Sequence, residues 1–331
     1  MKDYKKEIKK LKLKKLNFCF YLKTFVRDFL RVYNLLESFN KYNVDNINLV
    51  ISCPRNEVCK FNFPNLKNIV LIADEDFASK DLAKKIEWPN SNITIGYVNQ
   101  EICKLVFYKT GISSNYLCID SDLIFIRNFY INDFMFDAQT PYTVLVQDKD
   151  LSIQRYYKEK FWIGRQKKIE EIYKYLKLED PRFRTCHGMQ VFNTKSLLAL
   201  EKDFLNIKGL IWLDLIKISP YEFTWYNCWL QKSNLIEIKA CEPFFKVFHC
   251  REEYIVAQLT GLRTKDYAHS YVGLVLNSGW YSPKEYKDPP AIFYFLFKIL
   301  SFNYKLFLNK IFKKTAPKSI VLFIRKILKN Y

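Results

Sequence analysis

Glycine, histidine, paired cysteines and long apolar runs are all scarce in this chain. Its 331 residues include 8 Gly and three His, so each glycine is informative and few are filler. The 9 Cys form no CxxC pair and several lie inside apolar runs, which argues against zinc and indicates reduced, buried thiols in a cytosolic protein. The longest unbroken apolar run, Ala291–Phe297, is far shorter than the roughly 20 residues of a membrane-spanning helix.

Positive charge is abundant but concentrated at the two ends. The formal charge is +19, with eight Lys against Asp3 and Glu7 in residues 1–15, and eight Lys plus Arg325 without an acid in residues 291–331. A nucleic-acid enzyme would carry such charge across its folded face. We therefore expect an anionic membrane surface, and no nucleic acid, as a partner. No small-residue cleavage site follows an apolar segment near the N-terminus, so we expect no signal peptide.

The composition supports a folded core and a boundary near the C-terminal end. Hydrophobic residues make up 49% and aromatic residues 17% of the chain, which excludes global disorder. The length suits one large α/β domain or two ordinary ones, and Pro289-Pro290 marks a boundary. We expect a basic leader (1–15), a folded domain (16–288) and a basic helical tail (289–331).

The tail has the pattern of two basic amphipathic helices separated by Pro317. Its first half aligns polar side chains on one stripe, and its second half repeats the pattern: Lys298, Ser301, Lys305 and Asn309, then Lys318, Arg325 and Lys329. Such helices suit the interface of a membrane. The alternative is a helical hairpin packed on the protein's own surface. We expect residues 291–331 to bind anionic membranes.

Short apolar runs alternate with helical patterns between the two ends. Continuous apolarity is typical of strands covered on both faces, and alternating strands and helices predict an α/β fold with a mostly parallel central sheet and helices on both faces. Strands are expected at 16–25, 47–52, 68–73, 116–126, 142–147, 189–194 and from 245, and helices at 27–43, 99–111, 167–176, 196–205 and 221–233.

The run "YLCIDSDLIFI" (116–126) places Asp120 and Asp122 inside an apolar stretch. Buried carboxylates are costly unless a cation meets them. On an extended segment, side chains at i and i+2 point the same way, about 6.6 Å apart along the chain. Two such carboxylates can share Mg²⁺ or Mn²⁺, which prefer oxygen ligands and accept substrate phosphates. The alternative is a salt bridge with a distant partner.

Two further pairs weaken the signal of this spacing alone. Asp148/Asp150 is explained by a solvated turn. For Asp74/Asp76, at the end of a predicted strand, a turn and a site residue are equally good interpretations. Asp120/Asp122 has apolar strand on both sides, which a turn explains poorly.

The run resembles the metal-binding DxD strand of GT-A glycosyltransferases. The blocks "FYLKTFVRDFLRVYNLLESFNKYN", "GYVNQEICKL", "HGMQVFNTKSLL", "EFTWYNCWL" and "FKVFHCREEY" resemble, in order, those of an uncharacterised bacterial family among capsule and lipooligosaccharide sugar transferases. The resemblance covers most of residues 16–285. It implies a GT-A-like fold and glycosyl transfer, with Asp120 and Asp122 on a divalent metal and Asp120 near the nucleotide.

The same resemblance implies roles for residues around the donor. Thr24 and Asp28 would border the nucleotide pocket, and Asp74 would contact the nucleoside. Gln100 and Lys104 share a helix face, from which Lys104 would meet the diphosphate. The alternatives are helix capping for Thr24 and Asp28 and a solvated face for Gln100 and Lys104.

Further residues would serve the metal and the acceptor. His249 would complete the metal shell, or else be a core histidine bonded to backbone. His187 and Gly188 would lie near the donor sugar and the acceptor, where glycine allows close approach. Glu222 is the candidate general base on the acceptor hydroxyl, or an acid favoured by a helix N-terminus. Trp225 and Tyr226 would stack on a sugar or fill the core.

The resemblance therefore implies a metal-dependent transferase that uses a nucleotide-sugar and a glycan or lipid-linked glycan acceptor. We expect it in the cytoplasm, peripheral on the inner face of the bacterial inner membrane. One alternative is a sugar-phosphate or other nucleotide-dependent transferase on the same scaffold. The other is a non-catalytic basic interaction protein, either binding nucleic acid through its tails or serving as a degenerate scaffold.

Overall fold

The computed structural model describes residues 14–61, 63, 68–84, 93–146, 162–179 and 189–279. Almost all of the predicted leader, the whole tail, the pair Asp148/Asp150, and the site residues His187 and Gly188 lie outside these residues. Among the helices described here, none combines the length and the apolarity needed to cross a membrane.

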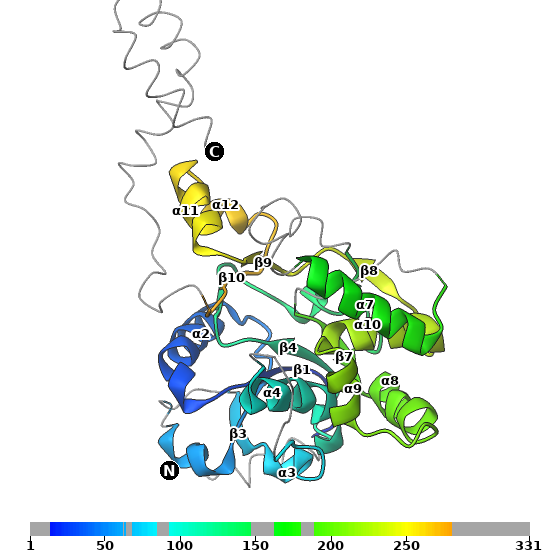
Figure 1. Ribbon diagram of the computed structural model, residues 1–331. Helices are drawn as coiled ribbons and strands as arrows, with labels where there is room; N and C mark the ends of the chain where they lie inside the picture. Colours follow the sequence, from blue (N-terminus) through cyan, green and yellow to red (C-terminus); the bar gives the residue numbers. More distant parts are fainter. Residues whose placement is uncertain are drawn as a thin grey trace, which may run out of the picture.

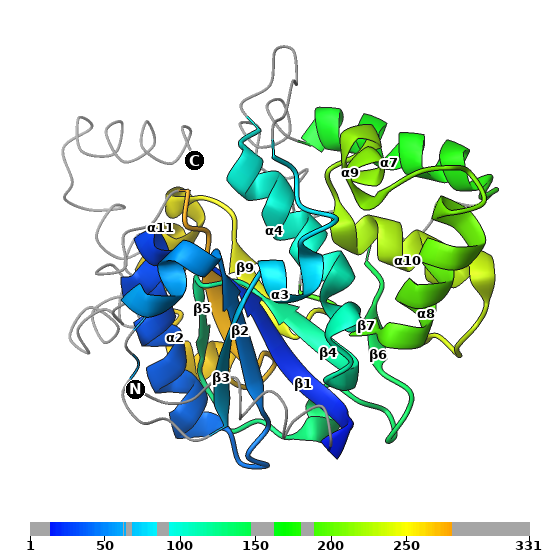
Figure 2. The same cartoon turned by 90° about the horizontal axis from the view of Figure 1, so that it is seen from below.

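A five-stranded sheet lies at the centre of the described fold (Figures 1 and 2). Its order is β3-β2-β1-β4-β7, and only β7 runs antiparallel to its neighbour. The strands are β1 (Leu16–Lys23), β2 (Leu49–Cys53), β3 (Ile69–Ala73), β4 (Ser113–Ile119) and β7 (Val191–Asn193). The predicted α/β class with a mostly parallel sheet is confirmed.

Two smaller sheets flank the central one. One has the order β5-β10-β9, formed by β5 (Leu123–Phe125), β10 (Gly273–Leu276) and β9 (Phe245–Phe248). The other pairs β6 (Tyr142–Val144) with β8 (Lys239–Cys241) in parallel. β5 and β10 are antiparallel, whereas β9 and β10 are parallel.

Helices connect and cover the strands. The α-helices are α2 (Phe29–Tyr42), α3 (Glu75–Ala78), α4 (Ile95–Val106), α7 (Ile163–Leu176), α8 (Thr194–Ala199), α9 (Trp212–Ile218), α10 (Glu222–Ser233), α11 (Arg251–Leu259) and α12 (Thr264–Tyr267). Short 3-10 turns occupy Val26–Asp28, Arg55–Lys60, Phe107–Thr110 and Ile131–Asp133, and α8 continues into a π-helical turn, η6 (Leu200–Leu205). Gly111 caps the turn after α4 in the left-handed region, at φ 66°, as predicted.

The alternation of side chains along β1 shows why both faces of the sheet are covered. Phe20 packs edge-to-face on Phe39 of α2. Tyr21 points to the opposite face, where its ring stacks at 4.0 Å on Phe107 at the end of α4. Both faces of this strand are therefore buried, which explains its continuous apolar sequence.

The aromatic side chains of α10 belong to the core. Trp225 and Tyr226 are fully buried. The Trp225 indole donates to the carbonyl of Ser219 at 2.8 Å, and the Tyr226 hydroxyl accepts the Asn193 amide at 2.8 Å. Their hydrogen bonds are thus satisfied inside the protein, and the core interpretation of this pair is the correct one.

The predicted strand 116–126 is wrong as a single element. β4 ends at Ile119 and β5 begins at Leu123, and the two strands belong to different sheets. Asp120, Ser121 and Asp122 lie between them in a turn, closed by a hydrogen bond from the Leu123 amide to the Asp120 carbonyl at 3.2 Å. The apolar residues on either side serve two sheets, and the three polar residues Asp120, Ser121 and Asp122 between them mark the turn.

Candidate functional site

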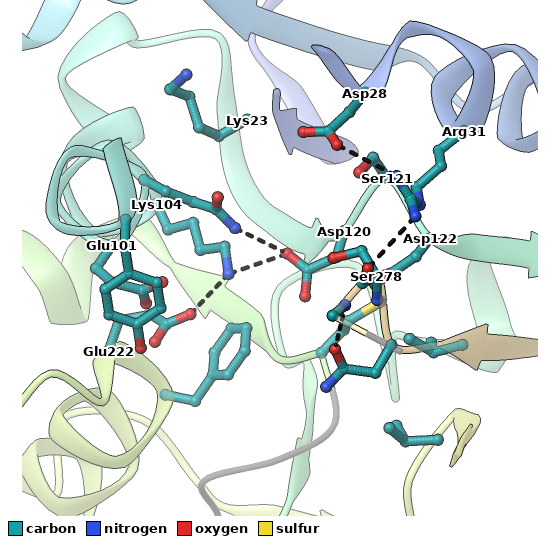
Figure 3. A pocket seen from close by; sticks show the side chains of 18 of the residues that line it. Lys23, Asp28, Arg31, Glu101, Lys104, Asp120, Ser121, Asp122, Glu222 and Ser278 are labelled. Carbon is teal, nitrogen blue, oxygen red and sulfur yellow. Dashed lines mark hydrogen bonds and ion pairs between the residues drawn. The ribbon is translucent and has the colours of Figure 1, made fainter. Parts of the chain in front are cut away.

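A pocket of about 590 Å³ opens beside this turn. It lies at the carboxyl ends of β1 and β4, where ligands usually bind in open α/β sheets. Its wall includes predicted site residues from distant parts of the chain. They are Gln100 and His249, together with Asp28, Lys104, Asp120, Asp122 and Glu222 (Figure 3). The structure therefore brings most of the described candidates together.

Asp122 links the turn to the end of β10. Its Oδ2 accepts a hydrogen bond from the Ser278 amide at 2.7 Å, and its carbonyl accepts the Leu276 amide at 3.2 Å. Its Oδ1 is buried and has no hydrogen-bond partner. Burial and the neighbouring charge of Asp120 raise the pKa of Asp122 to about 7. This carboxylate is poorly stabilised by the protein alone.

Asp120 is met by groups from α4. Its Oδ1 lies 3.1 Å from Lys104 Nζ (Figure 3) and accepts a hydrogen bond from Gln100 Nε2 at 3.4 Å. Gln100 and Lys104 therefore share a helix face, but that face points into the protein. The side chain of Lys104 is 4% exposed, so the solvated-face alternative is wrong for this residue.

Lys104 also joins Asp120 to Glu222, the first residue of α10. Its Nζ donates to Glu222 Oε1 at 2.8 Å. Burial by itself lowers the pKa of Lys104, but Asp120, Glu101 and Glu222 outweigh it and hold the pKa well above its usual value. Lys104 is a permanent ammonium placed between two helices and the Asp120–Asp122 turn.

Glu101 and Glu222 form a carboxyl pair behind Lys104. Both are buried, and they share a hydrogen bond. Burial and the charge of Glu222 raise the pKa of Glu101 well above its usual value. Burial also acts to raise the pKa of Glu222, but Lys104 and the hydrogen bond from Glu101 overcome it and lower that pKa. Glu222 therefore carries the negative charge of the pair.

Asp74 and Thr24 lie beside the pocket rather than in its lining. Asp74 Oδ2 is 3.1 Å from Lys23 Nζ in a fully buried ion pair, and Lys23 lines the pocket. Thr24 is buried, and its hydroxyl donates to the Phe25 carbonyl at 3.5 Å. Asp76 instead pairs with Arg55 at 2.6 Å, so Asp74 and Asp76 do not act as a pair.

Arginines on one wall of the pocket were missed in the sequence. Arg27 and Arg31 lie 3.7 and 3.6 Å from the carboxylate of Asp28, and Arg31 donates to the Ser278 carbonyl at 3.4 Å. Asp28 occupies the N-cap of α2 but makes no capping hydrogen bond with its side chain, so the capping alternative is wrong for it. The signal available was two arginines four residues apart, directly after a buried strand.

Lys23 and Arg165 were missed as well. Lys23 is the last residue of the otherwise apolar β1, and such a lysine is a signal because buried lysines are rare unless paired. Arg165 lies on α7, and its guanidinium carbon is 5.0 Å from the ring centroid of Tyr221. Both line the pocket. No comparable signal points to Arg165, which sits in an ordinary charged helix.

His249 follows the last residue of β9 and lines the pocket. Burial and the nearby charges of Arg165 and Lys246 lower the pKa of His249 to about 3, so its imidazole is neutral at neutral pH. Within the described ranges, no three side chains of His, Cys, Asp or Glu form a group that could hold a metal ion. Asp120, Asp122 and His249 are therefore not such a group in this conformation.

Comparisons with known proteins give a family and distant structural likenesses. Residues 13–248 match the model of a family of unknown function, DUF6492, and no curated protein matches. Among solved structures, the chain is similar to an active-site mutant of LgtC, with 13% identity and a TM-score of 0.45, over 91% of this chain and 98% of that one. It is also similar to the bifunctional glycosyltransferase WbbM in its apo form, with 11% identity and a TM-score of 0.40, over 79% and 46%.

Proposed function

Because the chain belongs to DUF6492, a family of unknown function, we propose its activity from the pocket itself: it is a metal-dependent glycosyltransferase that moves a sugar from a nucleotide-sugar to a glycan acceptor. The observation that carries the proposal is the turn with Asp120 and Asp122. Two adjacent carboxylates stand in a large pocket at the carboxyl edge of a parallel sheet, and one of them has a buried oxygen without a partner.

The turn suits a divalent cation. The pKa of Asp122 is raised because its charge is buried next to that of Asp120, and a cation would remove this penalty. Mg²⁺ and Mn²⁺ take one or two carboxylates and fill their remaining positions with waters and substrate phosphates. Asp120 and Asp122 would hold the ion, and the neutral imidazole of His249 stands in the same pocket. When bound, the ion supplies positive charge that offsets the charge of the leaving nucleoside diphosphate.

The phosphates would lie beside the cations that the pocket already contains. Arg27 and Arg31 stand at the entrance to α2, and the side chain of Arg27 is 70% exposed. Guanidinium groups bind phosphate oxygens with paired hydrogen bonds. Lys23, paired with Asp74 at 3.1 Å, adds a buried positive charge to the same wall. The nucleotide would therefore lie between β1, α2 and the turn.

The acceptor would approach from the side of α10 and α7. Glu222, Phe223 and Tyr221 line that side. Glu222 is charged, and a carboxylate there would orient an acceptor hydroxyl by accepting its hydrogen bond. Since Lys104 and Glu101 lower the pKa of Glu222, it is a weaker proton acceptor than a free carboxylate, which favours this orienting role over that of general base.

The biological setting extends the proposal. Following the resemblance to capsule and lipooligosaccharide sugar transferases, the acceptor would be a bacterial surface glycan, free or lipid-linked. Residues 291–331, with their basic and apolar sequence, would hold the enzyme on the cytoplasmic face of the inner membrane.

Thermal stabilisation by nucleotide-sugars tests the proposal. UDP-, GDP- and CMP-sugars would be added singly, with and without Mn²⁺, and donor hydrolysis measured in parallel. One nucleotide should raise the melting temperature only when Mn²⁺ is present, and Asp122→Asn should remove that dependence. Stabilisation of equal size without metal, or in Asp122→Asn, would contradict it. Stabilisation by the nucleotide with transfer of a group other than a sugar would favour another nucleotide-dependent transferase.

A further inference from the structure

The cation that meets Asp120 in this structure is the ammonium of Lys104. Its Nζ is 3.1 Å from Asp120 and 2.8 Å from Glu222. The side chains of Lys104 and Glu222 are 4% and 7% exposed, whereas that of Asp120 is 33% exposed. The ammonium therefore joins a deeply buried carboxylate to one that opens onto the pocket (Figure 3).

We propose that Lys104 is a resident counter-ion of Asp120 that a divalent cation displaces toward Glu222. The inference rests on the proposed metal site and deepens it. Lysine suits this exchange because its ammonium is a point charge on a flexible stem. The contact with Glu222 keeps Lys104 paired when Asp120 turns to the metal, so no buried charge is stranded. Lys104 retains its proton throughout.

Glu101 makes this exchange possible. The carboxyl groups of Asp120, Glu222 and Glu101 surround Lys104. If all three were ionised, the single ammonium of Lys104 would not balance their charge. Glu101 is 2% exposed, its Oε2 has no hydrogen-bond partner, and it shares a hydrogen bond with Glu222. A protonated Glu101 leaves Glu222 as the single charge behind Lys104, which matches one ammonium.

The arrangement has a consequence for metal affinity. Without metal, Lys104 neutralises Asp120 and reduces the repulsion between Asp120 and Asp122. A metal must compete with this ammonium, so its affinity is lowered by the free energy of the Lys104–Asp120 contact. Glu222 offsets part of that loss because it stabilises the displaced ammonium. Lys104 and Glu222 should therefore affect metal binding in opposite directions.

Titration of the full-length protein with Mn²⁺ alone, followed by the electron paramagnetic resonance signal of free Mn²⁺, tests the inference. Lys104→Gln should bind Mn²⁺ more tightly than the wild type by about tenfold, which corresponds to about 1.4 kcal/mol. Glu222→Gln should bind it several-fold more weakly. In the double variant, the effect of Glu222→Gln should disappear, because Glu222 acts through Lys104.

Two controls separate contact from general electrostatics. Arg27→Gln removes one positive charge from the same pocket without touching Asp120, and it should tighten Mn²⁺ binding only slightly, with an effect that salt screens. Glu101→Gln replaces a neutral group by a neutral group and should leave the affinity unchanged. If Lys104→Gln does not fold, Glu222→Gln compared with Glu101→Gln still tests the inference.

The outcomes are distinguishable. Saturable Mn²⁺ binding by the wild type that Lys104→Gln tightens no more than Arg27→Gln overturns the inference alone. An equal effect of Glu222→Gln in both backgrounds also overturns it. If neither the wild type nor Lys104→Gln binds Mn²⁺ in a way that Asp122→Asn abolishes, the proposed metal site fails, and the inference fails with it.

Discussion

Asp122 and Ser278 are joined by a hydrogen bond of 2.7 Å that ties the β4–β5 turn to the end of β10. An asparagine in place of Asp122 would keep an oxygen that accepts this hydrogen bond but would remove the negative charge. Since burial and Asp120 raise the folded pKa of Asp122 from 3.8 to about 7, the wild type loses stability as pH rises through that window and does not regain it above.

Asp122→Asn should therefore be more stable than the wild type in the absence of metal. The difference in free energy of unfolding should be smallest near pH 4, grow up to about pH 7 and then level off at a few kcal/mol. Denaturant titrations across this range measure it, with Asp203→Asn on an exposed residue as the control. A variant that is less stable at alkaline pH would show that Asp122 is an ordinary structural ion-pair partner.

Lys104→Ala should be strongly destabilising, whereas the same substitution on a solvent-exposed helix face would cost little stability. It leaves the buried Glu222, and Asp120 at the wall of the pocket, without their shared ammonium, and breaking a buried ion pair typically costs about 3–5 kcal/mol. Lys168→Ala, on the half-exposed pair with Glu171, should cost less than about 1 kcal/mol. Urea unfolding of both variants provides the comparison, and equal costs would contradict the buried network.

Glu101→Gln should leave the stability of the protein at low pH nearly unchanged but should alter the way in which that stability depends on pH. The folded pKa of Glu101 lies well above 4.5, so the wild type takes up a proton on folding above that pH and loses stability as pH rises. The variant takes up none at this position. Its melting temperature should rise relative to that of the wild type as pH increases above about 4.5. A difference independent of pH would mean that Glu101 is ionised.

Gly273→Ala should disturb the junction of β10 with β5. An added Cβ would stand 2.6 Å from the Ile124 carbonyl oxygen and 2.9 Å from Leu123 Cδ1, and backbone atoms cannot move aside cheaply. We expect a loss of about 1–3 kcal/mol. Gly164→Ala, in α7 with nothing within 4 Å, should instead stabilise by about 0.5–1 kcal/mol. Similar effects in both variants would refute the close approach.

Deletion of residues 291–331 should release the protein from anionic liposomes while the remaining chain stays folded. Each basic residue near such a surface contributes about 1 kcal/mol, and high salt should weaken the binding. Co-sedimentation with liposomes containing phosphatidylserine is the measurement, with neutral liposomes as the control. Unchanged co-sedimentation, or unfolding of the truncated protein, would support the packed-hairpin alternative.

Strands of the central sheet could be predicted from the sequence, but the turn between β4 and β5 could not. Continuous apolar runs predicted β1, β2 and β3, because each of these strands is buried on both faces. The helical spacing of Val32, Leu36 and Phe39 predicted α2. Apolar residues stand on both sides of Asp120, Ser121 and Asp122 in 116–126, since β4 and β5 are both buried, and this resembles one strand that carries two carboxylates. Which sheet a strand joins depends on contacts with distant β10, which local patterning does not contain.

The acidic residues that line the pocket were predicted from the sequence better than the basic ones. Asp120 and Asp122 were identifiable because acids are unusual in apolar surroundings, and Glu222 was identified through the resemblance of its segment. Lys104 was identified, but its partners were not, because Glu222 is 118 residues away. Arg165 carried no signal, since a charged residue on a charged helix has nothing to distinguish it until the fold brings it to the pocket.

The hydrogen bond between Asp122 and Ser278 spans 156 residues, and this has a consequence for synthesis on the ribosome. The chain emerges from its N-terminus, and domains fold as their parts appear. The central strands β1 to β4 can assemble early, while the Asp120–Asp122 turn still lacks the backbone that anchors it. The pocket is completed only when β10 has left the exit tunnel, so the candidate site stays incomplete until the fold is nearly finished.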